Sequence, residues 1–275
     1  MKIALTGSSG RVAKGIIARA RQQGHDLVLI DRLDPPEDAD SAYRFVRAEA
    51  GDFHAMVAAF AGCDAVIHMA AIPIPGTLPD HVVHNNNVVG SYNALRAAAE
   101  NGIRRVCQAS SVNAVGHAFS RVPRYDYFPI DEQHANYSED PYSLSKWICE
   151  EQGIAFARRY EGMAIASMRF HHVVPDLDSA IGVYGNNPEV AKHLWAWTAL
   201  DAAADACLLS LTAPFTGHEA FYIVAPQTIS TTPSQALARQ HFPNVPVTGD
   251  LTGHASFFSS KKAERMLGWQ HPGTI

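Results

Sequence analysis

Tyr142 and Lys146 have the most informative spacing in the sequence, because they stand four residues apart in the segment PYSLSK. That spacing places both side chains on one face of a helix, one turn apart. A free phenol has a pKa of about 10 and is a poor base at neutral pH. A neighbouring ammonium group favours the phenolate, so we expect Lys146 to lower the pKa of Tyr142. The same spacing also occurs by chance on helix surfaces, so the neighbouring residues must show whether it is functional here.

A pair of serines, Ser110 and Ser111, ends the apolar run Val106–Ala109. If that run is a parallel strand, its carboxyl end lies at the edge where open α/β sheets bind ligands. The Ser111 hydroxyl would there hydrogen-bond the reacting oxygen and share it with Tyr142. Ser110 is the alternative for this role, and a turn or helix cap is the alternative for Ser111. The pattern predicts a catalytic set of Ser111, Tyr142 and Lys146.

A glycine-rich turn, TGSSGRVA from Thr6 to Ala13, lies where a predicted strand ends and a predicted helix begins. Gly7 and Gly10 allow a tight turn that brings backbone N–H groups against a pyrophosphate at the helix N-terminus. Ala13 takes the third position of the GxxGxxG pattern, where a small residue permits close packing. Asp31 follows at the end of the next predicted strand, so the whole segment predicts a dinucleotide site.

Asp31 and Arg32 bear on the choice between NAD and NADP. The Asp31 carboxylate can accept hydrogen bonds from both hydroxyls of the adenosine ribose, and its charge would repel a 2′-phosphate. Arg32 acts in the opposite direction, because a guanidinium pairs well with that phosphate. An ordinary turn residue is the alternative explanation for Asp31. We predict NAD as the cofactor, with NADP as the alternative.

The elements that would position these residues follow an alternating order. Apolar runs without strict alternation are typical of parallel strands covered on both faces. The expected strands are Lys2–Thr6, Asp26–Ile30, Ala65–Met69, Arg104–Ala109 and Ala164–Arg169. Helical patterns occur at Phe53–Phe60, Val82–Glu100 and Pro141–Tyr160, and the first helix has an apolar stripe at Val12, Ile16, Ile17 and Ala20. We therefore predict an α/β fold, a Rossmann-type doubly wound parallel sheet.

After Pro175 the alternation of apolar runs and helical patterns becomes less regular, and prolines interrupt short segments. A further strand is expected at Phe221–Ala225 and a late helix at Ser259–Leu267. We expect residues 1–175 to form the dinucleotide-binding domain. Residues 176–275 are expected to form a small substrate-binding cap that is interleaved with the last elements of the sheet.

Composition excludes several functional classes. The 275 residues are 47% hydrophobic and 18% charged, with a net charge of −5, which is ordinary for a globular protein. No basic surplus exists to hold nucleic acid, and no apolar run approaches the roughly 20 residues that span a bilayer. The four cysteines are scattered, without the spacing of a metal site. We expect a cytoplasmic protein that binds no nucleic acid, membrane or metal.

Taken together, these motifs resemble the extended short-chain dehydrogenase/reductases, the NAD-dependent epimerase/dehydratase group. The resemblance covers nearly the whole chain. Further motifs that agree in order and spacing are Asp52, His68-Met69-Ala70-Ala71, Asn87-x-x-Gly90-x-x-Asn93, Gly116 after Ser110-Ser111, Asp131-Glu132, Arg169 to Pro175, and Leu267-Gly268-Trp269.

This resemblance implies hydride transfer between C4 of nicotinamide and a carbinol or carbonyl carbon, assisted by Ser111, Tyr142 and Lys146. It also implies that Asp52 lies at the adenine and that Asn87 supports the active site, whereas His68 is expected to be a packed strand residue. The expected cofactor-binding residues are Gly7, Ser9, Gly10, Arg11, Val12, Asp31, Arg32, Asp52, Phe53, Met69, Ala70, Ala71, Asn87, Ala109, Tyr142, Lys146, Phe170 and His172.

Among the shorter members, the chain looks most like the uronate dehydrogenases, which oxidise the anomeric carbon of an aldohexuronic acid to a lactone with NAD. Lys192, followed by Trp197, stands at the spacing of their substrate-binding Arg and would hold a carboxylate as a point charge. A solvated helix lysine is the alternative. Val112-Asn113 departs from the Asn-His pair usual in that family. The expected substrate-binding residues are Ile72, Ser111, Val112, Asn113, His171 and Lys192.

Three functions follow from these observations. The first is an NAD-dependent oxidoreductase acting on a small hydroxyl or carbonyl compound, with a uronic acid or related sugar as a candidate substrate. The second is a nucleotide-sugar epimerase or dehydratase that reduces its NAD transiently. A non-catalytic dinucleotide-binding regulator is the third. By the resemblance, the expected partner besides the small-molecule substrate is a second copy of the chain, paired through the helices that carry YxxxK and AsnxxGly.

Overall fold

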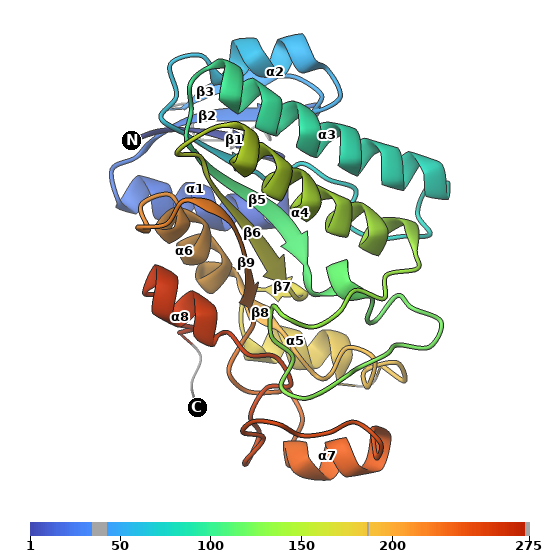
Figure 1. The fold of residues 1–275 in the computed structure, drawn as a ribbon. Helices are drawn as coiled ribbons and strands as arrows, with labels where there is room; N and C mark the ends of the chain where they lie inside the picture. The colour runs from blue at the N-terminus through green and yellow to red at the C-terminus, as the bar shows by residue number, and fades with distance from the viewer. Residues whose placement is uncertain (35–42, 186, 273–275) are drawn as a thin grey trace.

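A parallel seven-stranded sheet forms the centre of the protein, with the strand order β3-β2-β1-β4-β5-β6-β9 (Figure 1). The computed structural model describes residues 1–34, 43–185 and 187–272. The strands of this sheet are β1 (Lys2–Thr6), β2 (Asp26–Asp31), β3 (Arg44–Arg47), β4 (Ala65–His68), β5 (Arg105–Ser111), β6 (Ala164–Phe170) and β9 (Gly217–Ile223). A separate two-stranded sheet joins β7 (Val173–Val174) and β8 (Thr198–Ala199).

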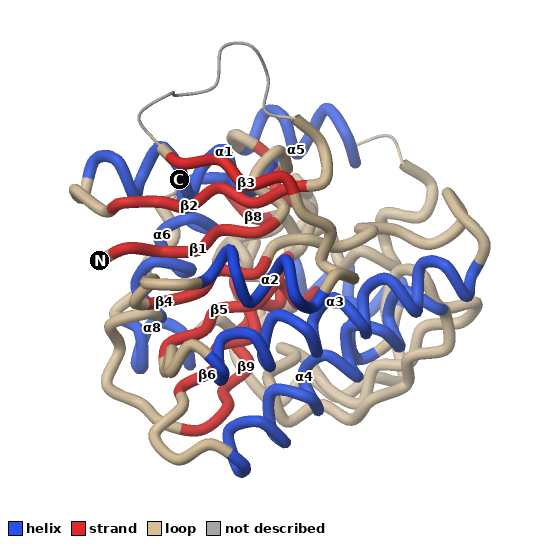
Figure 2. The backbone as a smooth tube through the Cα atoms, turned by 90° about the horizontal axis from the view of Figure 1, so that it is seen from above, coloured by secondary structure: helices blue, strands red, loops and turns tan. Residues whose placement is uncertain are grey.

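Helices cover both faces of the main sheet. Helices α1 and α6 pack together on one face, and α2, α3 and α4 lie side by side on the other (Figure 2). The helices are α1 (Arg11–Gln22), α2 (Phe53–Phe60), α3 (Asp80–Glu100), α4 (Pro141–Arg159), α5 (Leu177–Tyr184), α6 (Leu200–Ser210), α7 (Ser234–His241) and α8 (Lys261–Leu267), with a short 3-10 helix η1 at Val112–Val115. The predicted doubly wound α/β fold is confirmed.

Alternate residues of the central strand enter two different cores. Ile3 and Leu5 of β1 join the cluster that includes Ile16 of α1, whereas Ala4 joins the cluster that includes Met56 of α2. All of these side chains are fully or almost fully buried. Successive strand residues point to opposite faces, so a strand covered on both sides must be apolar throughout. This explains the unbroken apolar runs in the sequence.

The five predicted strands of the first two thirds are confirmed, but three end later than expected and one ends earlier. β2 continues to Asp31, β5 to Ser111 and β6 to Phe170, whereas β4 ends at His68. Both serines of the Ser110-Ser111 pair therefore belong to a strand. The predicted strand near Phe221 is β9, which begins earlier, at Gly217. The sequence analysis did not identify β3, α5, α6 or α7, nor the short pair β7 and β8.

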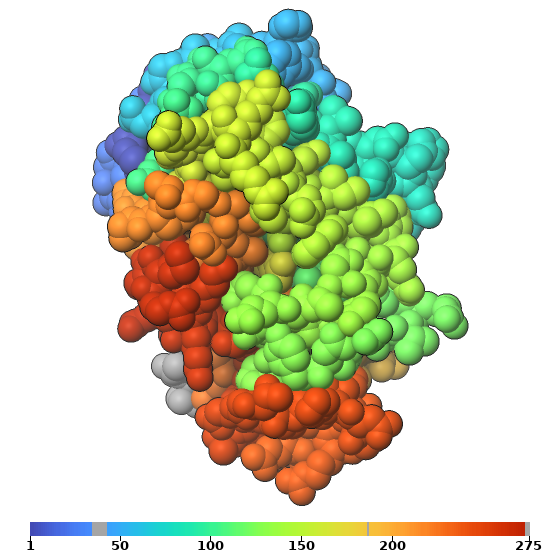
Figure 3. All heavy atoms as spheres, in the orientation of Figure 1, coloured from blue at the N-terminus to red at the C-terminus, as the bar shows by residue number. Residues whose placement is uncertain are grey.

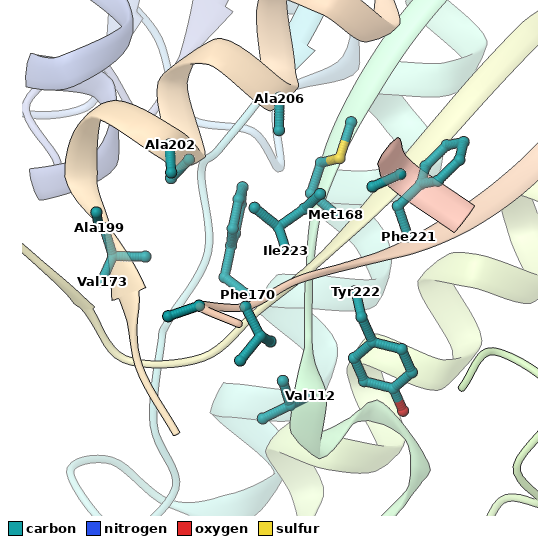
Figure 4. Packing of buried hydrophobic residues seen from close by; sticks show 14 of the residues in the cluster. Val112, Met168, Phe170, Val173, Ala199, Ala202, Ala206, Phe221, Tyr222 and Ile223 are labelled. Carbon is teal, nitrogen blue, oxygen red and sulfur yellow. The ribbon is translucent and has the colours of Figure 1, made fainter. Parts of the chain in front are cut away.

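Helix α6 packs beside α1 and covers the part of this face of the sheet that α1 does not cover. Gly15 of α1 permits its close approach, because a Cβ at that position would lie 2.9 Å from the Leu200 side chain. Ala202 and Ala206 of α6 face Phe170 and Ile223 from the sheet in Figure 4. Small residues on this helix therefore allow it to pack tightly against both a neighbouring helix and the strands.

The edge strand β9 pairs in parallel with β6, in a register that sets Tyr222 opposite Arg169 and Ile223 opposite Phe170. Ile223 points toward α6, whereas Tyr222 points to the other side of the sheet (Figure 4). The backbone N–H of Tyr222 donates to the Glu132 side chain at 2.9 Å. A side chain thus satisfies a backbone group that an edge strand would otherwise expose.

None of the helices in the described part of the chain is long and apolar enough to cross a membrane. The four cysteines, Cys63, Cys107, Cys149 and Cys207, are buried free thiols.

Gly116 provides a test of how tightly the chain after β5 is held. Its φ is +82°, and a Cβ there would overlap the backbone carbonyl of Tyr137. Gly162 has a similar φ of +74° but open space around it. We expect Gly162→Ala to lower the free energy of unfolding by about 1 kcal/mol. Gly116→Ala should lower it by at least about 3 kcal/mol, because overlap with backbone adds to the strain.

Urea unfolding monitored by circular dichroism measures both values. Equal losses of unfolding free energy in the two variants would contradict the close contact between Gly116 and Tyr137.

Candidate active site

A groove of about 260 Å³ lies at the carboxyl ends of the strands on the β1 side of the sheet. It is lined by predicted residues from three segments, namely Gly7, Ser9, Gly10, Asp31, Arg32, Met69, Ala70, Ala71 and Ile72. Residues that the sequence analysis missed also line it: Thr6, Ile30, Leu33, Ala48, Glu49, Ala50, Met56 and Asn86. Residues 48–50 come into the groove because they directly follow β3, which was itself missed.

The glycine-rich turn adopts a conformation that only glycine supports well. Gly7 has a φ of +67°, and a Cβ there would lie 2.6 Å from the backbone nitrogen of Ala70. Gly10 caps α1 without a side chain, and the first turn of α1 carries no acidic residue. The backbone N–H groups at this helix N-terminus therefore face the turn without a competing side chain, which suits a phosphate group. Ala13 is fully buried, as expected for a packing position.

Asp31 closes one side of the groove. Its carboxylate accepts hydrogen bonds from the backbone nitrogens of Ser9 at 2.9 Å and Leu33 at 3.0 Å. A carboxylate has about four acceptor positions, so acceptor capacity remains for two ribose hydroxyls. The combination of a phosphate-binding turn and a fixed carboxylate across the groove fits the adenosine diphosphate half of a dinucleotide.

Other predicted cofactor residues lie outside this groove. Asp52 caps α2, accepting a hydrogen bond from the Ala55 nitrogen at 3.0 Å, and Phe53 begins that helix. The Arg11 guanidinium lies 3.3 Å from His172 Nε2 and donates to the Val173 carbonyl at 3.0 Å. These contacts connect the N-terminus of α1 to the segment after β6. Val12 and Phe170 contribute to the core on the α6 side of the sheet.

The local sequence explains why α4 begins where it does. Asp140 is its N-cap, and its carboxylate accepts hydrogen bonds from the backbone nitrogens of Tyr142 and Ser143 at 3.0 and 2.9 Å. Pro141 takes the first helical position, which lacks a partner for an N–H in any case. Tyr142 is therefore fixed in the first turn of α4, one turn before Lys146.

Ser111, Tyr142 and Lys146 meet at the carboxyl end of β5. The Ser111 side chain lies close enough to the Tyr142 phenol to act on its pKa, and the Lys146 ammonium donates to the Ala109 carbonyl at 2.9 Å. Ser110 instead donates to the Glu150 carboxylate at 2.5 Å. The structure thus places Ser111, and not Ser110, beside the phenol.

The pKa of Tyr142 differs from the sequence expectation. Burial raises the pKa of this phenol to about 12, and the hydrogen bond with Ser111 acts in the opposite direction. The Lys146 ammonium is directed to Ala109 and lies 5.8 Å from the centroid of the Tyr142 ring. In the protein without ligand, burial therefore outweighs the lowering of the pKa that we expect from Lys146. In this state Tyr142 is a neutral hydrogen-bond donor.

Asn87 of α3 connects the groove to α4. Its amide exchanges hydrogen bonds with both backbone groups of Ile72, at 2.8 and 3.1 Å, and donates to Ser145 at 3.1 Å. Ser145 in turn donates to the Tyr142 carbonyl at 2.7 Å. Asn87 thus supports the position of α4 relative to the turn after β4.

The predicted substrate-binding residues have mixed surroundings. Val112 is buried, and the Asn113 side chain accepts a hydrogen bond from the Ala118 nitrogen at 2.9 Å. His171 is buried, and its ring contacts those of Tyr184 and His193. Lys192 lies in the turns between α5 and α6, not in a helix, and forms an ion pair with Glu189 at 2.6 Å.

Phe119 is a site residue that the sequence analysis missed. Its ring meets the Tyr142 ring edge-on, with centroids 5.7 Å apart. It reaches this position from the loop after η1, and no sequence pattern marks it.

A second and larger hollow, about 830 Å³, lies near the end of β9. It opens between α8 and the segment around Tyr127, as Figure 3 shows. Its lining includes Asp131, Asp250 and Lys261 but none of the Ser-Tyr-Lys set. Among the described residues, no cluster of His, Cys, Asp or Glu is arranged to hold a metal ion.

Comparison with known families decides the classification. The model of the NAD-dependent epimerase/dehydratase family matches residues 3–219. The chain belongs to this family. NAD is thus the cofactor of the family, as predicted, and the resemblance to the extended short-chain dehydrogenase/reductases is confirmed.

Curated relatives are more distant. A UDP-glucose 4-epimerase of Corynebacterium glutamicum is 27% identical over 203 residues, 70% of this chain and 56% of that protein. An L-arabinose 1-dehydrogenase (NAD(P)(+)) of Haloferax volcanii is 31% identical over 175 residues, 61% of this chain and 65% of that protein. An uncharacterised protein of Mycobacterium tuberculosis is 38% identical over 114 residues, 40% of this chain. The chain spans only 12% of that protein and little more than half of the epimerase.

Solved structures share the fold over the whole chain. One is a short-chain dehydrogenase/reductase superfamily protein of Agrobacterium tumefaciens with bound NAD, with a TM-score of 0.74 and 23% identity over 93% of its length. Another is a UDP-glucose 4-epimerase of Thermotoga maritima with UDP-glucose, with a TM-score of 0.73 and 18% identity over 94% of its length. At such identities the match establishes the fold.

His68 offers a test of site electrostatics by pH. The ring is buried beside Thr6, 2.7 Å from its hydroxyl, and burial lowers the pKa of His68 to about 3. Between pH 6.5 and 3 the unfolded chain binds a proton that the folded chain excludes, so stability falls as the pH falls. We expect His68→Asn to reduce this slope by up to about 1.4 kcal/mol per pH unit.

The measurement is urea unfolding between pH 7.5 and 5. His54→Asn, at an exposed position of α2, serves as the control. An identical slope in wild type and His68→Asn would show that His68 is not held neutral.

Proposed function

We propose that this protein is an NAD-dependent oxidoreductase that transfers a hydride between nicotinamide and a small hydroxyl or carbonyl substrate. The observation that carries the proposal is the meeting of Ser111, Tyr142 and Lys146 at the carboxyl end of β5. That edge adjoins the groove with the glycine-rich turn and Asp31. Family membership supports NAD as the cofactor of this chain.

Each catalytic residue has a distinct task in this proposal. When bound, the cofactor would accept the hydride as NAD or supply it as NADH, and the positive charge of the oxidised nicotinamide would favour an anionic Tyr142. Tyr142 takes the proton from the substrate hydroxyl in the oxidation, or gives a proton to the carbonyl oxygen in the reduction, and Ser111 hydrogen-bonds the same oxygen. Lys146 would hold the nicotinamide ribose beside Tyr142. The buried positions of all three exclude water from the reaction.

A small sugar, with uronic acids as the first class to test, is the proposed substrate. About 100 residues follow Pro175, and two of the elements they form, α6 and β9, belong to the layers of the main sheet. We propose that residues 1–175 bind the dinucleotide and that residues 176–275 form a small cap. An arabinose dehydrogenase among the relatives supports this substrate size.

Lys192 keeps its proposed role at a substrate carboxylate only if it exchanges Glu189 for the ligand. Val112 offers no hydrogen bond to a sugar, whereas His171 lies at the end of β6, beside the end of β5. Asn113 and Ile72 complete the proposed substrate contacts.

An epimerase acting on a nucleotide sugar is the second candidate, because UDP-glucose 4-epimerases are among the relatives. The two reactions differ in their use of cofactor. A dehydrogenase converts free NAD to NADH as substrate is consumed, whereas an epimerase shows no net reduction of NAD.

The remaining proposals are a cytoplasmic location and a homodimer. The exposed apolar side chains Val89 and Tyr92 on α3 and Leu144 on α4 support the latter.

The proposed reaction is tested by absorbance at 340 nm with NAD and a panel of aldoses and uronic acids. We expect at least one of them to yield NADH in stoichiometric amounts. Tyr142→Phe should reduce kcat by at least about 100-fold and leave the Kd for NADH nearly unchanged, while Tyr92→Phe, at an exposed position of α3, retains full activity. Isomerisation of a sugar nucleotide without net NADH would favour the epimerase instead.

Cofactor preference is tested at Asp31. Asp31→Ser removes the charge that repels a 2′-phosphate, so the ratio of kcat/KM with NADP to that with NAD should rise by about 10-fold or more. Asp34→Ser, at an exposed position that pairs with Arg47, is the matched control. If wild type already uses both cofactors equally, Arg32 outweighs Asp31.

A further inference from the structure

Glu150 shares a face of α4 with the two proposed catalytic residues. Tyr142, Lys146 and Glu150 follow one another at intervals of four residues, so they form one stripe along the helix. All three are almost completely buried. An acidic residue is rarely buried in this way unless it is paired, so its partners indicate what it does.

The partners of Glu150 lie on two neighbouring strands. The Ser110 hydroxyl donates to its carboxylate at 2.5 Å. The Arg169 guanidinium donates to both carboxylate oxygens, at 2.9 and 2.7 Å, and both side chains of this ion pair are only 3% exposed. Ser110 and Arg169 are themselves paired in the register of β5 and β6. Glu150 therefore fixes α4 to both strands directly beside Ser111.

We propose that Glu150 is a positioning residue for the catalytic face of α4. It fixes the helix on the ends of β5 and β6 and supplies the negative charge that balances the buried Lys146 ammonium. The assignment rests on the proposed function only in giving Tyr142 and Lys146 their catalytic roles.

The charges around Lys146 support this assignment. Burial lowers the pKa of Lys146, whereas Cys149 and, after it, Glu150 act in the opposite direction. Burial raises the pKa of the Cys149 thiol, which therefore stays neutral. The Arg169 guanidinium, by contrast, helps to hold the pKa of Glu150 below its usual value. Glu150 is thus the anion that favours a charged Lys146.

The titratable groups named below, on the strands β4, β6 and β9, do not supply a negative charge in place of Glu150. On β4, the pKa of His68 is lowered to about 3, so this histidine is neutral. On β9, burial lowers the pKa of His218 to about 4 and raises that of Tyr222 to about 12, so both are neutral. Arg169 on β6 is a cation and opposes the charge on Lys146. Among these groups Glu150 alone carries a negative charge.

Removing Glu150 by itself would leave Arg169 buried without a partner, which is strongly destabilising. Two variants separate this effect from the proposed one. Glu150→Gln keeps the shape of the side chain, and Glu150→Gln combined with Arg169→Met removes both charges of the pair. Glu151→Gln is the matched control, because Glu151 is an exposed acid at the next position of the same helix.

The charge on Lys146 can be measured without substrate or cofactor. The chain has few lysines, which makes their side-chain amines easy to resolve by NMR after isotope labelling: Lys2, Lys14, Lys146, Lys192, Lys261 and Lys262. Lys146→Arg assigns the relevant signal. In wild type at pH 7.5 we expect Lys146 to be protonated. In Glu150→Gln its titration midpoint should fall by about one unit or more. The fall should be smaller in the double variant, which also removes the opposing Arg169 charge, and Glu151→Gln should show no change.

Two results would overturn the assignment. The first is a neutral Lys146 in wild type at pH 7.5, which needs no variant to fold. The second is a Glu150→Gln variant that folds, by circular dichroism, and titrates at Lys146 as wild type does. Because no turnover is measured, either result leaves the proposed reaction to its own assay, and an absence of dehydrogenase activity leaves this assignment intact.

Discussion

The docking of one face of α4 onto the carboxyl ends of β5 and β6 is the interaction on which the proposed site depends. The contacts along this face are of three kinds. Tyr142 lies beside the Ser111 side chain, Lys146 donates to a backbone carbonyl, and Glu150 joins a buried ion pair. Each removes a polar group from water, so each must be satisfied within the protein. Together they allow little rotation of the helix about its axis.

The nucleotide groove is built by a different constraint, the close approach of two backbone turns. Gly7 at the end of β1 touches the backbone of Ala70 after β4. This leaves the first turn of α1 facing the groove, with Asp31 across from it. Asn87 then connects the turn after β4 to α4 through Ile72 and Ser145. The groove and the catalytic helix are therefore parts of one hydrogen-bonded framework.

The sequence predicted what depends on local pattern. Apolar runs identified the buried strands, and the spacing of Tyr142 and Lys146 identified a helix face. β3 was missed because only two of its four residues, RFVR, are apolar and the other two are charged. It therefore does not form the apolar run by which the other strands were identified. Helix α6 was missed because its small apolar side chains give it no clear polar face.

Contacts between distant segments were beyond such patterns. The Glu150–Arg169 pair joins residues 19 positions apart through the topology of the sheet. The direction of the Tyr142 pKa shift was beyond sequence patterns for a related reason. Spacing along a helix shows that two side chains share a face, but the direction of the ammonium depends on the carbonyl that β5 presents. Burial, which decides the pKa of Tyr142, is likewise a property of the assembled fold.

A crystal structure of the protein with bound NADH tests the central claim most directly. The account predicts that the nicotinamide C4 lies next to Tyr142, with its hydroxyl about 4 Å away and with room for a substrate carbon within about 3.5 Å of C4. It also predicts that the Lys146 ammonium contacts the nicotinamide ribose. A nicotinamide ring bound elsewhere, with the Tyr142 hydroxyl about 10 Å or more from C4, would contradict the account.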